Sequence, residues 1–373
     1  MESPLQALQR FGQSPWFDNI QRGLLTSGAL QRMVADGDIT GLTSNPTIFE
    51  QAIGKSSDYD DALGRLARAG KSADEIFDAL AIEDIRAAAD VFLPVFKRTG
   101  GADGHVSIEV NPVFAGDTDR SIAEAMRLWR AVERPNLLVK IPGTRAGVMA
   151  VERCIAEGLS INVTLIFSLE RYAEVIDAYQ AGISKRVAAG QDVSGIASVA
   201  SFFVSRVDTA TDALLEERIR AGGDRPALEA LRGKAAIANA KLAYQLFLER
   251  FARPAWAELA AAGARVQRPL WASTSTKNPA YPDVYYVEAL VGRDTVDTMP
   301  PQTVAAYKDH GVPEPRLTQG LDEARAVMAD LARSGIDMAV VTQKLEEDGV
   351  ASFARSFESL LQTVEKRRAA IAR

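Results

Sequence analysis

Short apolar or β-branched runs alternate along the chain with longer stretches of helical periodicity. Eight runs have the length and composition of strands: 16–20, 39–44, 106–110, 137–141, 161–167, 197–204, 269–274 and 295–299. The stretches 74–96, 119–133, 170–187 and 226–250 carry apolar residues at helical spacing, as Phe77, Ala81 and Ile85 do in the first of them. Strands that alternate with helices predict a mostly parallel sheet.

Side chains alternate between the two faces of a strand, and in 106–110, 137–141 and 161–167 this separates apolar from polar positions. One face of each strand is entirely apolar and suits packing against helices. The opposite faces carry Glu109, Lys140, Asn162 and Thr164. These polar side chains are therefore expected to point into a common space.

Polar residues also mark the ends of the first, second and sixth strands, at Asp18, Asn45 and Ser201. In an open doubly wound sheet, six neighbouring strand ends would spread over about 24 Å, much wider than a small metabolite, since each strand adds about 4.8 Å. A closed barrel brings them together at its carboxyl-terminal rim, where barrel enzymes have their active sites. We predict a single α/β domain over 1–373, a (β/α)₈ barrel with extra helices at both ends and in loops. The helical stretch 321–373 is expected to pack on the outside of the barrel.

The composition limits the chemistry available to such a site. Among 373 residues, of which 47% are hydrophobic and 25% charged, there are two histidines and one cysteine. These side chains supply most metal sites, disulfides and proton transfers near neutral pH. A zinc cluster or an intramolecular disulfide is therefore excluded, and a histidine-based triad would need His105 or His310. We expect no metal and no cofactor, and a reaction carried by Lys, Asp, Glu or hydroxyl groups.

The formal net charge of −6 argues against general binding to nucleic acid or to a membrane surface. The segment MESPLQALQRFGQ has neither the basic nor the apolar region of a signal peptide, and no apolar stretch approaches the ~18 residues of a membrane span. With its single Cys154 in a helical pattern, the protein is expected to be cytoplasmic. We also expect it to act on small molecules and to be a monomer or a homodimer.

Lys140 is the candidate nucleophile, because it ends a strand that is otherwise apolar and its side chain belongs to the inward face. Burial desolvates an ammonium and favours the neutral amine, which can attack a carbonyl and form a Schiff base. The structural alternatives are a lysine that reaches solvent at the strand end, or one half of a buried ion pair with Glu109.

Glu109 and Asp18 are the candidate proton carriers. Cleavage of a carbon–carbon bond beside an imine needs a base for a hydroxyl proton, and imine formation and hydrolysis need an acid/base at the carbinolamine. Two carboxylates can divide these tasks without histidine. The structural alternatives are Asp18 as the cap of a following helix and Glu109 as a structural partner of Lys140.

Amides and hydroxyls complete the polar set. Asn45, in GLTSNPTIF (41–49), suits a helix N-cap with Pro46 at the first helical position, or an amide that points toward a substrate hydroxyl. Asn162 and Thr164 lie inside a predicted strand, where polar side chains need partners, and water and substrate can supply them.

Two segments are candidates for binding a phosphate. SFFVSR (201–206) ends the sixth strand and opens a helix, where free backbone N–H groups and the fork of Arg206 suit an anion. WASTSTK (271–277) ends the seventh strand and offers hydroxyls with one cation, Lys277, in a region where barrels often bind phosphate. Each cation has a simpler interpretation as a surface residue.

Five motifs, in order, resemble transaldolases of the longer bacterial type: GLTSNPTIF (41–49), SIEV (107–110), LLVKIPGT (137–144), INVTLIFS (161–168) and SFFVSR (201–206). WASTSTKNPAY (271–281) and TVDTMPPQT (295–303) are similar to the remaining strand ends of that family. The resemblance implies a metal-free class I barrel transferase of the non-oxidative pentose phosphate pathway. Such an enzyme moves a dihydroxyacetone unit from sedoheptulose 7-phosphate or fructose 6-phosphate to glyceraldehyde 3-phosphate or erythrose 4-phosphate through a lysine Schiff base.

The resemblance implies a role for each catalytic candidate. Lys140 matches the Schiff-base lysine and Asp18 the base for the C4 hydroxyl. Glu109 matches the acid/base that acts through a water held by Thr164.

The resemblance also implies the substrate contacts. Asn45 and Asn162 match the amides that hold the dihydroxyacetone part, and Ser201 and Arg206 match the hydroxyl and phosphate contacts. Phe203 resembles the aromatic residue beside the family's active site. Many relatives have a second arginine for phosphate in the seventh strand, whereas the nearest cation here is Lys277, a point charge without a bidentate fork.

Two other functions fit the same residues. A simple class I ketose-phosphate aldolase would use the same lysine and carboxylates and would release free dihydroxyacetone. A non-catalytic sugar-phosphate-binding barrel is the second, because a fold does not determine a function. A barrel kept only as a scaffold has little reason to bury Lys140 and Glu109 together.

Overall fold

The computed structural model of the protein describes residues 2–371. Its strands form one closed barrel in which every strand runs parallel to its neighbours in chain order, and β8 closes on β1. The strands are β1 (Gln13–Asp18), β2 (Gly41–Thr43), β3 (Val106–Glu109), β4 (Leu137–Pro142), β5 (Ile161–Ile166), β6 (Ser198–Phe203), β7 (Arg268–Ala272) and β8 (Thr295–Met299). Each overlaps its predicted range, so the eight strands and the (β/α)₈ barrel are confirmed.

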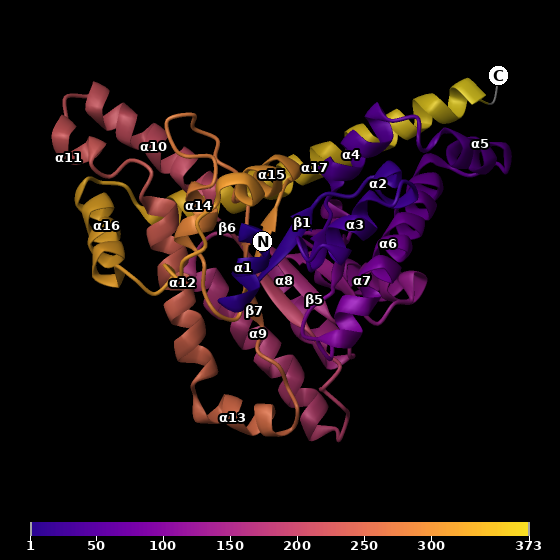
Figure 1. Ribbon diagram of the computed structural model, residues 1–373, viewed down its shortest axis with the longest axis horizontal. Coiled ribbons are helices and arrows are strands. Elements are labelled where there is room, and N and C mark those ends of the chain that lie inside the picture. Colours follow the sequence, from indigo (N-terminus) through magenta and orange to yellow (C-terminus); the bar gives the residue numbers. More distant parts are fainter. Residues whose placement is uncertain (1, 372–373) are drawn as a thin grey trace.

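Helices surround the barrel and fill the connections between its strands (Figure 1). In the first half of the chain they are α1 (Pro4–Arg10), α2 (Arg22–Thr26), α3 (Ala29–Ala35), α4 (Pro46–Lys55), α5 (Asp60–Arg68), α6 (Ala73–Arg98), the 3₁₀ turn η1 (Pro112–Phe114), α7 (Thr118–Val132), α8 (Arg145–Ala156) and α9 (Leu169–Ala188). In the second half they are α10 (Ser205–Arg220), α11 (Arg225–Glu229), α12 (Ala235–Phe251), α13 (Pro254–Ala261), α14 (Tyr285–Ala289), α15 (Pro301–His310), α16 (Leu321–Arg333) and α17 (Met338–Ile371).

The single helix predicted over 226–250 is wrong, because α11 and α12 are separate. The chain turns between them at Gly233, whose φ of 69° lies in the left-handed region that glycine adopts without strain. The Gly233 N–H donates to Asp212 Oδ1 at 2.9 Å, which fixes the turn against α10. The helical spacing of apolar residues continues across the turn in the sequence, and that continuity hid the break.

Side-chain caps start the helices that follow three of the strands. Asn45 caps α4 after β2, Thr144 caps α8 after β4, and Ser168 caps α9 after β5, each by accepting a backbone N–H of the first turn. A cap of this kind stabilises a helix by about 1 kcal/mol and sets its first residue. The strand ends that carry the candidate site residues are therefore followed at once by a fixed helix start.

The barrel interior is packed below the level of the candidate site. Trp16, on β1, is fully buried and its Nε1 donates to Asp103 Oδ1 at 2.8 Å. Its indole occupies the space opposite Gly41 on β2, where a Cβ would lie 2.5 Å from the ring. Tryptophan and glycine thus fill one layer together, and Asp18 and Thr43 follow two residues later on the same faces of these strands.

The outward faces of the strands pack against helices in one continuous apolar core. Val106, Val139 and Val163, from three adjacent strands, belong to the same buried cluster as Ile85 of α6 and Val151 of α8. This is the arrangement that the apolar faces predicted. It leaves the inward faces free for polar side chains.

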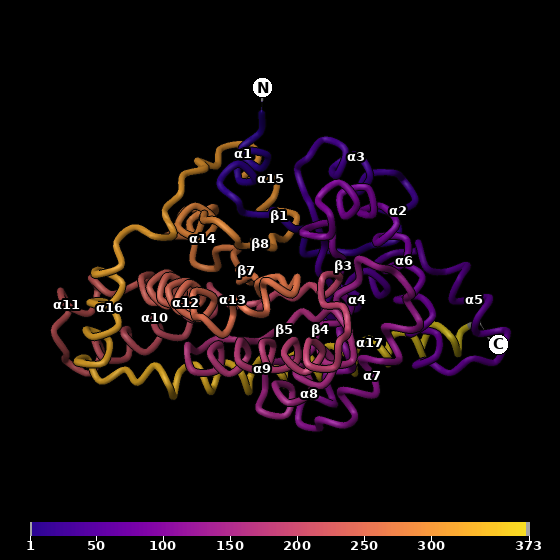
Figure 2. Tube along the Cα trace, turned by 90° about the horizontal axis from the view of Figure 1, so that it is seen from below, coloured from indigo at the N-terminus to yellow at the C-terminus, as the bar shows by residue number. Residues whose placement is uncertain are grey.

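The C-terminal helix α17 is the longest element of the fold. Figure 1 shows it in yellow, running from the side of α16 past the barrel toward α4 and α5, and Figure 2 shows it extending across most of the width of the molecule. It contacts α4, α5, α6, α10, η1 and the end of β5. It therefore lies over the carboxyl-terminal end of the barrel and does not pack only on the outside.

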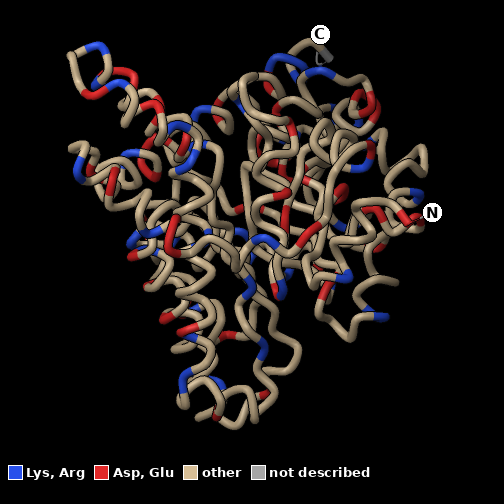
Figure 3. The backbone as a smooth tube through the Cα atoms, turned by 60° about the vertical axis from the view of Figure 1, so that its left-hand side comes forward, with Lys and Arg blue, Asp and Glu red and all other residues tan. Residues whose placement is uncertain are grey.

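Acidic and basic residues are interspersed along most segments of the backbone (Figure 3). Within residues 2–371, none of the helices combines the length and the apolarity that crossing a membrane requires.

The Trp16–Gly41 layer gives the first prediction. In Gly41→Ala the new methyl would overlap the buried indole, and overpacking of a rigid core costs about 1–3 kcal/mol of unfolding free energy. Urea denaturation followed by circular dichroism measures this loss.

The matched control is Gly64→Ala in α5, where a Cβ meets only the Arg68 guanidinium at 3.5 Å. This substitution is expected to raise the unfolding free energy by about 0.5–1 kcal/mol, because alanine favours a helix interior over glycine. Equal effects of the two substitutions would contradict the packing described for Trp16.

Candidate active site

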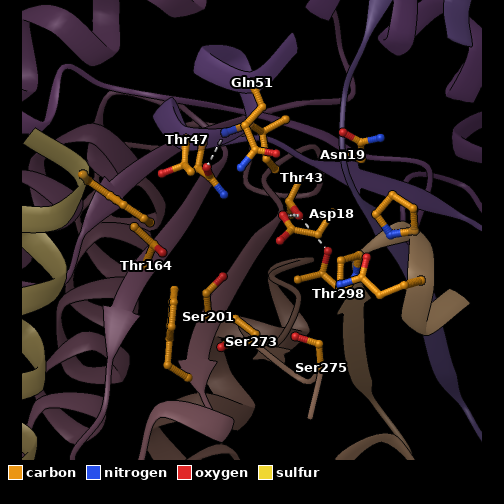
Figure 4. A pocket seen from close by; sticks show the side chains of 18 of the residues that line it. Asp18, Asn19, Thr43, Thr47, Gln51, Thr164, Ser201, Ser273, Ser275 and Thr298 are labelled. Carbon is orange, nitrogen blue, oxygen red and sulfur yellow. Dashed lines mark hydrogen bonds between the residues drawn. The ribbon is translucent and has the colours of Figure 1, made fainter. Parts of the chain in front are cut away.

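A cavity of about 590 Å³ opens at the carboxyl-terminal end of the barrel, and Figure 4 shows the side chains that line it. Eight of the ten predicted site residues are among its lining: Asp18, Asn45, Lys140, Thr164, Ser201, Phe203, Arg206 and Lys277. They come from four strands and from the loops and helices that follow strands of the barrel. The remaining two, Glu109 and Asn162, are buried next to lining residues.

Lys140 lies at the floor of the cavity and is 4% exposed. Its Nζ donates to the backbone oxygen of Ser44 at 3.2 Å and lies 3.3 Å from Glu109 Oε2. The register of the strands places Lys140 beside Glu109 on one side and Asn162 on the other. The amine is thus held between neighbouring strands at a single level of the barrel.

Glu109 lies behind the amine, with its side chain only 2% exposed. Burial raises the pKa of Glu109 to about 7, although the charge of Lys140 opposes the shift. Neither carboxylate oxygen, nor the buried Thr164 Oγ1, has a hydrogen-bond partner among the described residues. Near neutral pH the Glu109 carboxyl can therefore act as both acid and base, and these oxygens are available to a water or to a substrate group.

Asp18 forms the opposite wall of the cavity. Its Oδ1 accepts a 2.6 Å hydrogen bond from Thr43 Oγ1, and Thr43 lies 2.6 Å from Thr298 Oγ1, as the dashed lines of Figure 4 show. Burial raises the pKa of Asp18, while the positive charge of Lys140 lowers it. A carboxylate that is desolvated and aimed into the cavity is suited to accept a proton from a bound hydroxyl.

Asn45 and Asn162 differ in their hydrogen-bond partners. Asn45 Oδ1 accepts the N–H of Ile48 at 3.0 Å, so the residue is both a helix cap and part of the cavity wall. Asn162 is fully buried; its Nδ2 donates to Ser107 Oγ at 3.1 Å and its Oδ1 accepts from Ser201 Oγ at 2.7 Å. Both ends of the Asn162 amide are thus hydrogen-bonded within the protein, and the amide orients the Ser201 hydroxyl.

Two cations occupy the cavity wall away from the amine. The guanidinium of Arg206 lies 5.4 Å from the ring centre of Phe203, and Lys277 Nζ donates to Ser275 Oγ at 2.6 Å. Burial lowers the pKa of both groups, and Arg206 further lowers that of Lys277. Within residues 2–371 neither forms an ion pair. Two cations of this kind, close enough to repel each other, suit an anionic group such as a phosphate.

Two of the N–H groups expected to be free at the start of α10 already have acceptors. Ser205 N donates to Ser273 O at 3.0 Å, and Val207 N donates to Val204 O at the same distance. The start of this helix therefore has fewer open N–H groups than SFFVSR led us to expect. The anion-binding capacity of this segment lies chiefly in the side chain of Arg206.

Sequence reasoning did not identify two further residues at the site. Phe353 of α17 lines the cavity with its ring centre 5.8 Å from Lys140 Nζ. In the sequence Phe353 is one of several apolar positions of an amphipathic helix, and such a position does not reveal what it packs against. Thr43, which holds Asp18, stands two residues before Asn45 in GLTSNPTIF, and strand parity would have placed it on the inward face.

The family model described as transaldolase/fructose-6-phosphate aldolase matches residues 15–364. The chain belongs to this family. The matched segment includes all ten predicted site residues, the strands that carry them and Phe353. The resemblance stated from five motifs is thereby confirmed over nearly the whole chain.

Curated relatives match this chain over nearly its whole length. The chain is 49% identical over 357 residues to a transaldolase from Thiobacillus denitrificans, covering 96% of this chain and 98% of the relative. It is 47% identical over 367 residues to a transaldolase from Parafrankia sp., with 98% of each chain covered. It is 48% identical over 371 residues to a transaldolase from Thermobifida fusca, with 99% and 100% covered.

Residues 2–371 hold no group of three or more His, Cys, Asp or Glu side chains that could ligate a metal ion. The acidic side chains in and beside the cavity come from different strands and do not form such a group.

Asp297, on β8, is a buried carboxylate outside the cavity lining. Its Oδ1 accepts from Thr274 Oγ1 at 2.8 Å, whereas Oδ2 has no partner in the described part of the chain. Burial raises the pKa of Asp297 to about 7. Thr274 precedes Ser275 in the loop that carries Lys277, so this carboxylate supports one wall of the site.

The pH dependence of stability gives the second prediction. Between the unfolded pKa near 3.8 and the folded pKa of about 7, the folded protein keeps a proton on Asp297 that the unfolded chain has lost. Asp297 therefore contributes stability at low pH that disappears as the pH rises toward 7, on the order of 2 kcal/mol between pH 5 and pH 8. Asp297→Asn should flatten the decline of thermal stability over this range.

The control is Asp294→Asn, immediately before β8, where the side chain is 55% exposed. This variant should follow the wild-type decline of melting temperature with pH. An unchanged pH profile in Asp297→Asn would refute the assignment.

Proposed function

We propose that the protein is a transaldolase that transfers a dihydroxyacetone unit between sugar phosphates through a Schiff base on Lys140. The donors would be sedoheptulose 7-phosphate or fructose 6-phosphate, and the acceptors glyceraldehyde 3-phosphate or erythrose 4-phosphate. This reaction belongs to the non-oxidative pentose phosphate pathway, which operates in the cytoplasm. The observation that carries the proposal is the buried amine of Lys140 with carboxylates on two sides and two cations in the same cavity.

The first steps form the imine. The Lys140 amine attacks the C2 carbonyl of the ketose phosphate, and the carbinolamine loses its hydroxyl as water when a proton is supplied. Glu109, 3.3 Å from the amine, is placed to supply and recover that proton, directly or through a water bound by Thr164. A pKa of about 7 suits a group that must do both.

The next step breaks the C3–C4 bond. Asp18 takes the proton of the C4 hydroxyl, C4 becomes the carbonyl of the departing aldose phosphate, and the electron pair of the broken bond moves into the iminium to give an enamine. An acceptor aldose phosphate then occupies the same place, and the reverse steps form the new bond. The resulting kinetics should be ping-pong.

The phosphate position follows from the charge distribution. Arg206 and Lys277 lie on the β6 and β7 side of the cavity, away from Glu109. A bound phosphate there would hold the leaving part of the donor and the incoming acceptor in the same orientation, so that C4 returns to one position in each half-reaction.

The family also includes fructose-6-phosphate aldolase, so a simple aldolase is the second candidate. The two reactions share every step up to the enamine. They diverge when the enamine either meets an aldose phosphate or is protonated and hydrolysed to free dihydroxyacetone. Release of dihydroxyacetone without acceptor, at a rate equal to transfer, would favour the aldolase.

Reductive trapping tests the proposal and is the third prediction. Borohydride added with fructose 6-phosphate should reduce the imine and attach a substrate-derived adduct to the peptide that contains Lys140, as peptide mass mapping would show. Lys140→Arg should carry no adduct and should lose transfer activity by at least about 10³-fold, because the covalent route is removed. An adduct on any other lysine, in wild-type protein that is active, would overturn the mechanism.

The fourth prediction concerns Arg206. Loss of a charge-assisted hydrogen bond to phosphate costs about 1.5–3 kcal/mol, so Arg206→Ala should lower kcat/KM for glyceraldehyde 3-phosphate by about 10- to 100-fold. With glyceraldehyde, which has no phosphate, kcat/KM should stay near the wild-type value. Lys277→Met should show the same selectivity with a smaller loss, because Lys277 is more exposed than Arg206. An equal loss with both acceptors would show that these residues do not bind phosphate.

A further inference from the structure

The helix α17 is fixed across the mouth of the barrel at three places along its length. Near its start, Glu346 pairs with Arg171 of α9 at 3.2 Å. In its middle, Ser356 Oγ accepts from Thr47 Oγ1 at 2.9 Å, and Thr47 itself lines the cavity. Toward its end, Arg367 bonds to the backbone of Ile53 in α4. The helix is therefore held in one position relative to the site.

The central part of α17 approaches β5 closely. A Cβ at Gly349 would lie 3.0 Å from Leu165 Cδ2 and 3.8 Å from the Arg206 guanidinium, so the absence of a side chain at residue 349 favours this close approach. Leu165 has a φ of 59°, at the place where the pairing of β5 with β6 shifts register. This irregular strand end immediately follows Thr164, so α17 rests on the part of β5 that carries a candidate site residue.

Phe353 lies one turn beyond Gly349 and faces the cavity. Its side chain is 4% exposed and its ring centre is 5.8 Å from Lys140 Nζ. Phe357, one turn later, packs instead on Phe77 with ring centres 5.5 Å apart and does not line this cavity. Of these two aromatic residues, only Phe353 is near the amine.

An aromatic ring at this place has two physical effects on the amine. Its face attracts a cation, which applies to the ammonium of Lys140 and to an iminium formed from it. Its apolar surface also occupies space that water would otherwise share with the amine, and a dry environment prevents unwanted proton transfer to a reactive intermediate. Both effects bear on the enamine of the proposed function.

We propose that Phe353 is a positioning residue that keeps water away from the enamine on Lys140, so that the protein transfers the three-carbon unit and does not release it. This inference rests on the proposed function. The reaction that Phe353 suppresses is protonation of the enamine carbon by water, followed by addition of the resulting hydroxide to the iminium carbon and release of the amine. One water is consumed for each dihydroxyacetone set free.

The ratio of dihydroxyacetone release to transfer tests this role and is the fifth prediction. Release is measured with fructose 6-phosphate alone, and transfer with erythrose 4-phosphate as acceptor. Phe353→Ala, which opens the space of the ring to water, should raise the ratio by about tenfold. Phe353→Leu, which fills more of that space, should raise it by about two- to threefold, and this variant decides the matter if the alanine variant does not fold.

Phe357→Ala is the matched control, because it removes the same ring from the same helix at a position that does not line the cavity around Lys140. It should lower the melting temperature and leave the ratio at the wild-type value. A wild-type ratio in folded Phe353→Ala or Phe353→Leu would overturn the inference, as would an equal rise in Phe357→Ala.

Borohydride trapping on each variant separates this inference from the proposed function. An adduct on Lys140 with an unchanged ratio means that Phe353 has no such role, although the Schiff-base mechanism holds. Absence of the adduct from active wild-type protein means that the proposed function itself fails, and the inference fails with it.

Discussion

The desolvated pair of Lys140 and Glu109 is the interaction on which the site depends. Burying two ionisable groups costs several kcal/mol for each charge, and their attraction at 3.3 Å offsets this only while the geometry is maintained. The strands supply that geometry, because β3 and β4 pair residue to residue at this level and the Ser44 carbonyl binds the amine from β2's end. Trp16 of β1 and Gly41 of β2 fill one layer of the barrel interior below the site, and this layer limits any collapse of the barrel into the polar space above it.

Acidic and basic side chains occupy different parts of the cavity. Glu109 is buried beside the amine and Asp18 is half-buried in the cavity wall, and desolvation raises the pKa of both carboxyl groups. The cations Arg206 and Lys277 lie farther out, where a doubly charged phosphate can reach them without crossing the amine. A single cavity thus has one part suited to proton transfer and another suited to binding an anion.

The barrel and most of the site could be predicted from the sequence because both depend on local rules. Alternation along a strand determined that Glu109, Lys140 and Thr164 face inward, and the strand ends placed Asp18 and Ser201 at the same rim. The cap at Asn45 was predicted in the same way, and the main error was the single helix expected over 226–250.

The features that could not be predicted are those that depend on contacts between distant segments. The position of Phe353 results from α17 docking on α4 and β5, which the amphipathic pattern of one helix does not specify. The engagement of Asn162 by Ser107 and Ser201 and the occupied N–H groups of α10 arise from three-dimensional neighbours in the same way.

The place of α17 in the chain has a consequence for how the site forms. All eight strands precede it, so during synthesis the barrel and its buried amine emerge from the ribosome before the helix that covers them. Until α17 docks through Thr47 and Arg171, the mouth of the barrel is open to water and its apolar rim is exposed. A closed active site therefore forms only once α17 has docked over the barrel.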